Sequence, residues 1–103
     1  FHSRGQIIYY FRGAMPASYN KESERMARHL QSLAHYDLGS SGDEFGDASS
    51  GGNSVNYYSE VFHKLALTVE TVADEAVFPL DTEYQIHTYE EIKKIPFSFL
   101  ERI

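Results

Sequence analysis

The sequence predicts a small α+β domain that is mostly helical, with a long central helix and a minor two-stranded sheet. Two stretches, 21–36 and 55–77, repeat apolar residues at helical spacing, and two shorter ones, 6–11 and 83–87, have the composition or the alternation of strands. A chain of 103 residues with 42% hydrophobic residues can bury one modest core. We therefore expect residues 1–103 to form a single domain.

The first expected element is a strand in the segment GQIIYYF, residues 5–11. Its β-branched and aromatic residues favour a strand, and because both faces are apolar, we expect it to be covered on both sides. Pro16 cannot continue the ladder of hydrogen bonds. The same stretch partly matches a tag-and-protease leader that ends in Ala-Met. An alternative is therefore that residues 1–14 derive from an expression vector and that the native chain starts at Met15.

The second expected element is an amphipathic helix over 21–36, in which apolar residues recur every three or four positions. Asn20 is a good N-cap residue for it. Glu24 and Arg28 are spaced to form an ion pair on its outer face.

The stretch that follows, residues 37–54, holds five Gly, five Ser and four acidic residues. This composition favours a mobile acidic linker, which we place at 38–54. Ser40 and Ser41 each precede an acidic residue by three positions, a pattern that acid-directed kinases prefer. Phosphorylation, which would add negative charge to the segment, is therefore an alternative role.

A calcium site is the other alternative for this segment. Counted from Asp37, Gly42 occupies the sixth position of an EF-hand loop, as that loop requires. Gly39 and Ala48, however, stand at the third and twelfth positions, where the loop needs oxygen ligands from side chains. The ligand pattern therefore argues against calcium.

The clearest expected element is the long central helix over 55–77. Seven apolar residues step through it by three and four positions: Val55, Tyr58, Phe62, Leu65, Val69, Val72 and Ala76. Pro79 marks its end, and further apolar residues such as Leu67 widen the stripe beyond a two-stranded coiled-coil seam. We expect a core helix packed on more than one side, with Glu60 and His63 on its solvated face.

The C-terminal part is expected to contain a short strand and then a helix. Tyr84 and Ile86 alternate with polar residues over 83–87, which favours a half-exposed strand. Thr88 opens a capping box, T-Y-E-E, so a helix should begin there. Pro96 interrupts this helix, and a terminal helical turn follows.

Residue patterns that indicate catalysis or metal binding are few. The chain has no Cys, which excludes disulfides, zinc ribbons and thiol catalysis. Glu60-x-x-His63 has the spacing of half a carboxylate-bridged di-iron site, but no second such pair is present. Glu83 and His87 share a face of the expected strand, and two ligands do not make a metal site. The sequence also lacks a nucleotide-binding glycine motif and a nucleophile elbow, so we expect neither a metal nor a cofactor.

The net charge of −6 is unevenly distributed. Residues 1–36 carry five basic and two acidic residues, and residues 37–103 carry four basic and thirteen acidic ones. The two parts can attract each other within the fold, or the acidic part can form a surface for a basic protein partner. A nucleic-acid partner is not expected, because the cations of the first part are mixed with acids. No apolar run is long enough for a membrane span, and the absence of Cys and of a signal peptide favours a cytoplasmic location.

These observations support three hypotheses about function. The first is a non-enzymatic protein–protein interaction module, such as an adaptor or a small acidic inhibitor or immunity-type protein, with an acidic, Tyr-containing surface. Its candidate contacts are Tyr57 and Leu67, which point away from the helical seam, and six acids: Asp74, Glu75, Asp81, Glu83, Glu90 and Glu91. The second is a structural subunit that homo-oligomerises through the 55–77 helix. The third is a small enzyme with a His–carboxylate pair, which requires the two groups to meet in a cleft.

Overall fold

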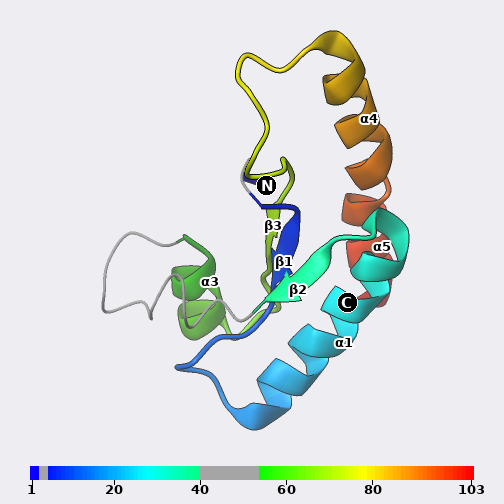
Figure 1. The fold of residues 1–103 in the computed structure, drawn as a ribbon. Coiled ribbons are helices and arrows are strands. Elements are labelled where there is room, and N and C mark those ends of the chain that lie inside the picture. Colours follow the sequence, from blue (N-terminus) through cyan, green and yellow to red (C-terminus); the bar gives the residue numbers. More distant parts are fainter. Residues whose placement is uncertain (3–4, 40–53) are drawn as a thin grey trace.

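The structure, a computed structural model, describes residues 1–2, 5–39 and 54–103. In chain order its elements are β1 (Ile7–Tyr9), α1 (Ala17–Ala34), β2 (Asp37–Gly39), α3 (Ser54–Phe62), β3 (Thr68–Glu70), α4 (Thr82–Ile92) and α5 (Ile95–Arg102) (Figure 1). The predicted α+β class is confirmed, with a sheet of three strands where the sequence predicted two.

β1 is the central strand of this sheet, whose order is β2-β1-β3. It runs parallel to β2 and antiparallel to β3, with Ile8 opposite Leu38 on one side and Val69 on the other. Ile8 is fully buried, as expected for a strand whose faces are apolar. Residues 7–9, which belong to the stretch that resembles a vector leader, form the centre of the sheet.

α1 confirms the helix expected at 21–36, although it begins and ends earlier. Pro16 occupies the N-cap position, and Asn20 instead lies inside the helix. The Asn20 side chain accepts a hydrogen bond from the backbone N–H of Arg12 and donates one to the carbonyl oxygen of Arg12. His35 ends the helix in the left-handed conformation, with φ 60°, a position that glycine commonly fills.

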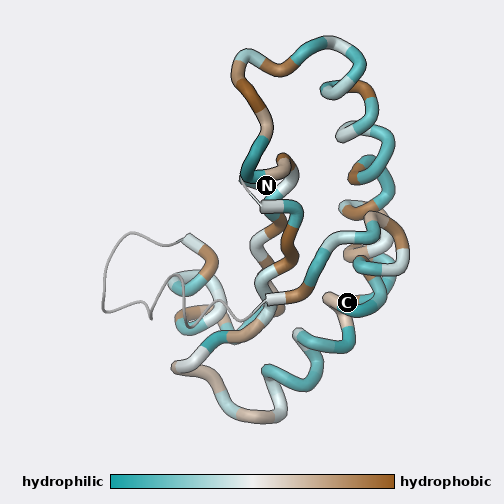
Figure 2. The backbone as a smooth tube through the Cα atoms, in the orientation of Figure 1, coloured by the Kyte–Doolittle hydropathy of each residue, from teal (hydrophilic) through white to brown (hydrophobic). Residues whose placement is uncertain are grey.

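The hydrophobic core lies between the sheet, one face of α1 and the start of α5. Its buried residues are Ile8, Met26, Ala27, Leu30, Ala34, Tyr36, Val69 and Ile95. Figure 2 shows the hydrophobic positions concentrated in β1 and β3, whereas much of α1 is hydrophilic. The spacing of the buried residues in α1 gives the helix a single apolar stripe, so its opposite face is left to water.

The predicted long helix over 55–77 is wrong. α3 ends at Phe62, the chain passes through His63 with φ 55°, and β3 follows. β2 covers only one edge of β1, so an extended segment on the second edge is needed to pair the remaining backbone groups. The β-branched residues of 68–72 favour this conformation, and pairing with Ile8 buries Val69.

α3 also turns a different face inward from the one predicted. Asn56 and Ser59 are buried and Glu60 is half-buried, whereas Tyr58 of the expected seam is exposed. The buried hydroxyl of Ser59 is satisfied within the helix, because it donates a hydrogen bond to the carbonyl oxygen of Asn56 at 3.0 Å. The prediction that Glu60 lies on a solvated face is therefore wrong.

The predicted strand at 83–87 is wrong as well, because α4 occupies this segment. The Asp81 side chain accepts a hydrogen bond from the backbone N–H of Tyr84 at 2.8 Å, so the helix starts here rather than at Thr88. Both edges of β1 are already paired with β2 and β3. The interruption predicted at Pro96 is present, since α4 ends at Ile92 and Pro96 lies in the first turn of α5.

The predicted linker at 38–54 overlaps the structure only at its ends. Leu38 and Gly39 belong to β2, and a Cβ atom added at Gly39 would lie 2.9 Å from the ring of Tyr9, so the close approach of these strands requires glycine. Ser54 is the first residue of α3. The rest of the linker, with the phosphorylation and calcium candidates, lies outside the described residues.

Candidate binding surface

Residues 73–92, which we call the arm, extend away from the sheet. The arm consists of a loop and the helix α4 that follows it (Figure 1). α4 has no buried residue, in contrast to α1, which buries five. One side of α4 is half-buried, at Tyr84, Thr88, Glu91 and Ile92, so it is the residues on the opposite side that are available to a partner.

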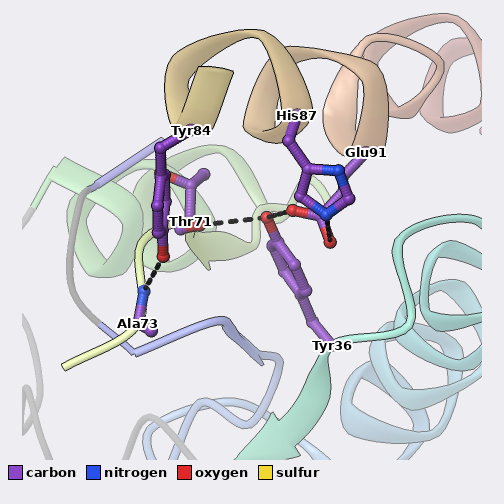
Figure 3. Close-up of polar contacts among 6 residues, drawn as sticks. All are labelled: Tyr36, Thr71, Ala73, Tyr84, His87 and Glu91. Atoms are coloured by element: carbon purple, nitrogen blue, oxygen red, sulfur yellow. Dashed lines mark hydrogen bonds and ion pairs between the residues drawn. The ribbon is translucent and has the colours of Figure 1, made fainter. Parts of the chain in front are cut away.

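The Tyr36 hydroxyl attaches the arm to the rest of the molecule, and the Tyr84 hydroxyl links α4 to the first residue of the arm (Figure 3). The Tyr36 hydroxyl lies 3.0 Å from the carbonyl oxygen of Thr71 and 3.3 Å from Oε1 of Glu91. The Tyr84 hydroxyl accepts a hydrogen bond from the backbone N–H of Ala73 at 3.2 Å. Burial, together with the neighbouring carboxylate of Glu91, raises the pKa of Tyr36 well above its usual range, so this hydroxyl stays protonated and donates.

The arm is strongly acidic. From Leu65 to Ile92 the chain has seven carboxylate side chains and no Lys or Arg. Five of the six predicted acidic contacts are exposed on the arm: Asp74, Glu75, Asp81, Glu83 and Glu90. Glu91 is different, because it is half-buried and its carboxylate contacts Tyr36 and, at 3.6 Å, the Nε2 of His87. Five of the six acids thus lie exposed on the arm, and the sixth, Glu91, contacts Tyr36 where the arm joins the rest of the molecule.

Apolar side chains are exposed between these acids. The exposed fractions are 82% for Val77, 57% for Ile86 and 62% for Tyr89. Figure 2 shows hydrophobic positions in the loop that leads into α4, outside the sheet. Apolar residues grouped on an exposed surface and bordered by charge are typical of a protein interface.

The two remaining predicted contacts do not lie on the arm. Tyr57 is exposed on α3, where its ring meets that of Phe62 edge-on at 6.4 Å between centroids. α3 and α4 are well separated in Figure 1. Leu67 is half-buried and lines an apolar cavity of about 370 Å³ together with residues such as Val69 and Phe99. The predicted set therefore divides into the acidic arm and two separate residues.

The structure contains two His–carboxylate contacts that bear on the enzyme hypothesis. His87 lies near Glu91, as described above, and Nδ1 of His2 lies 3.5 Å from Oε1 of Glu70. Neither pair borders the apolar cavity or the larger hollow of about 750 Å³ beside the start of α1. Neither His–carboxylate contact therefore adjoins one of these two cavities, in which a substrate could be held.

Over residues 1–2, 5–39 and 54–103, no group of three His, Asp or Glu side chains is arranged to hold a metal ion. In the same part of the chain, no helix combines the length and the apolar character that crossing a membrane requires. Comparisons with protein families, with curated proteins and with solved structures find no match. The function is therefore argued from the surface itself.

Sequence reasoning did not identify Val77, Ile86 and Tyr89 as exposed apolar residues of this segment. The sequence predicts a strand at Ile86, and a strand does not group this residue with Tyr89. On a helix, residues three positions apart lie on the same face. The signal was present in Asp81, a preferred N-cap residue at the start of α4. A helix begun there would have put Ile86 and Tyr89 on one face, beside the acids.

Proposed function

We propose that this protein is a non-enzymatic protein–protein interaction module that binds a basic, partly apolar protein surface through its arm. The observation that carries the proposal is that α4 has no buried residue and exposes Ile86 and Tyr89 between carboxylates. The Cys-free composition supports an intracellular setting for this module, in the cytoplasm.

The two kinds of residue on the arm have different roles. Burying Ile86 and Tyr89 against a partner supplies the free energy of binding, and tyrosine is frequent among the residues that dominate interfaces. The carboxylates select a partner of opposite charge and accelerate its approach. A partner with Lys or Arg around an apolar centre is complementary to both.

The structural-subunit hypothesis requires an interface other than the predicted 55–77 helix, because that segment is divided between α3 and β3. Val69 and Val72, which were to form part of the seam, are buried within the molecule.

A binding experiment with a defined probe tests the proposal. The probe is a synthetic amphipathic helix with Lys residues beside a Leu face, and its affinity is measured by fluorescence anisotropy. We expect the double variant Glu83→Gln/Glu90→Gln to bind about tenfold more weakly, the equivalent of about 1.4 kcal/mol. The matched control, Glu22→Gln/Glu24→Gln, removes two exposed helical carboxylates from α1 and should bind as the wild type does.

Salt provides a second readout, because an electrostatic contribution at an exposed surface is screened. The difference between the arm variant and the control should shrink as ionic strength rises. Equal affinities of the two variants at low salt, or no binding of the basic helix at all, would refute the proposal.

A further inference from the structure

We propose that a second copy of this chain binds the arm, with α4 of each copy lying antiparallel against α5 of the other. This inference rests on the proposed function, because it names the partner of the same surface. It follows from the way that apolar and charged residues are distributed along α4 and α5.

The two helices form one nearly continuous rod. Lys93 and Lys94, which join them, both keep right-handed helical backbone angles. Pro96 lacks the N–H that would hydrogen-bond back across the junction, which explains why the helix is interrupted without changing direction sharply. The inward-facing residues continue at helical spacing through the junction: Tyr84, Thr88, Glu91, Ile95 and Phe99 are all buried or half-buried. Because one face is turned inward along the whole rod, the opposite face is turned outward along it.

That outward face has apolar residues on both helices. Ile86 and Tyr89 lie on α4, and Phe97 and Leu100, with exposed fractions of 73% and 64%, lie on α5. The junction between them contributes the side chain of Lys93, whose Nζ lies 6.0 Å from the centre of the Tyr89 ring. The exposed apolar surface therefore runs over a rod of about 30 Å, at about 1.5 Å per residue.

Charge is segregated along the same rod. The α4 end has exposed acids at Asp81, Glu83 and Glu90 and no Lys or Arg, whereas the junction and the α5 end carry three cations and one acid. The cations are Lys93, Lys94 and Arg102, and the acid is Glu101. An antiparallel pair of rods brings each acidic end against a basic end, whereas a parallel pair brings like charges together. The charge pattern thus selects the antiparallel arrangement and a partner identical to the chain itself.

One register satisfies the apolar and the charged residues together. With the twofold axis midway between residues 91 and 92, Ile86 of one copy lies opposite Phe97 of the other. The same axis sets Glu90 opposite Lys93. Within one copy, Nζ of Lys93 already pairs with Oε2 of Glu90 at 2.5 Å. Both side chains are partly exposed, so exchanging this pair between copies costs little.

Charge reversal tests the arrangement in the full-length protein. One variant, Glu83→Lys/Glu90→Lys, makes the exposed face of α4 basic, and the other, Lys93→Glu/Lys94→Glu, makes the junction acidic. Sedimentation equilibrium should show a wild-type dimer and, for each variant alone, at least a tenfold weaker dimer. An equimolar mixture of the two variants should recover a tight heterodimer, because opposite charges again meet.

Cysteine crosslinking tests the register, and the absence of native Cys leaves no competing disulfide. A mixture of Ile86→Cys and Phe97→Cys proteins should form crosslinked dimers under mild oxidation. Ile86→Cys alone should crosslink far less, because two copies of residue 86 lie about 16 Å apart in this register, beyond the reach of a disulfide.

Failure of this inference can be separated from failure of the proposed function. A wild-type protein that stays monomeric at high concentration, or a dimer that neither charge-reversed variant weakens, overturns the inference. If that same protein still binds the basic probe helix through Glu83 and Glu90, the proposed function stands with a different partner. If the probe also fails to bind, both are refuted.

Discussion

The arm and the sheet-and-α1 part of the molecule differ in whether their charged side chains are exposed or buried. Arg12, between β1 and α1, is buried, and its guanidinium donates hydrogen bonds to the carbonyl oxygens of Phe11 at 2.9 Å and Ala66 at 3.2 Å. This burial lowers the pKa of Arg12 to about 10. The exposed carboxylates of the arm, by contrast, are mostly directed at water.

This difference indicates which part of the chain is constrained by folding and which part leaves its charged side chains to solvent. A buried cation is tolerated only where acceptors surround it, so the backbone around Arg12 has to be held in place. Tyr19 contributes to this, since its hydroxyl donates to the carbonyl oxygen of Lys64 and accepts from the N–H of Ala66. The exposed residues of the arm contribute little to the folding free energy, and under the proposed function they are the ones that contact a partner.

The largest expected contrast is between an apolar residue of the core and one of the arm. Leu30→Ala removes a buried side chain and should lower the free energy of unfolding by about 3 kcal/mol. Ile86→Ala should change it by less than about 0.5 kcal/mol, because the side chain is exposed. Urea denaturation at low protein concentration measures both. Equal losses would show that the Ile86 side chain is packed against the protein as Leu30 is, and would contradict the distinction between core and arm.

The next contrast is between two arginines. Arg12→Met leaves the acceptors of a buried guanidinium without their donor and should cost about 2–3 kcal/mol. Arg28→Met removes an exposed partner of Glu24 and should cost less than about 1 kcal/mol. Thermal unfolding monitored by circular dichroism compares them. A smaller loss of stability for Arg12→Met than for Arg28→Met would contradict the role of the Arg12 hydrogen bonds in stabilising the sheet-and-α1 part.

The smallest contrast concerns the joint between the two parts. Tyr36→Phe removes the hydroxyl that contacts Thr71 and Glu91 and should cost about 1 kcal/mol at neutral pH. The folded-state pKa of Tyr36 is raised, so its contribution to stability is complete below pH 10. Above pH 10 the unfolded chain releases this proton, whereas the folded chain keeps it. The contribution of the hydroxyl to the free energy of unfolding therefore falls by up to about 1.4 kcal/mol per pH unit.

The stability advantage of the wild type over Tyr36→Phe should therefore narrow as the pH rises above 10. Urea denaturation of both proteins at pH 7 and at several values above pH 10 measures this. Arg12 also titrates in this range, but it is common to both proteins and cancels in the difference. A constant difference between the two proteins across pH 7–11 would show that the Tyr36 hydroxyl titrates normally.

The sequence predicted best those elements whose pattern and partners are local. α1 was found because its apolar stripe recurs within the helix, and its predicted Glu24–Arg28 pair forms at 2.7 Å between neighbouring turns. β1 was found because strand-forming residues are dense there and apolar on both faces. Five of the six acids proposed as contacts are exposed, and their role in binding stays a prediction.

The elements that were missed have patterns compatible with more than one conformation. Leu65 and Val69 fit a helical seam, yet Leu65, Leu67 and Val69 also alternate as a strand does. Tyr84 and Ile86 alternate too, but the cap at Asp81 begins a helix. Local spacing alone did not decide either case.

By itself, the sequence determined a cysteine-free chain with one amphipathic helix, one apolar strand and a concentration of carboxylates after residue 65. Only the tertiary structure decided that 68–70 is a strand, that 82–92 is a helix, and that Ile86 and Tyr89 face water. The physical reason is that a strand completes its hydrogen bonds with a distant segment. The second edge of β1 is paired by a segment about sixty residues away in the sequence, so the local pattern of that segment could not by itself show that it is a strand.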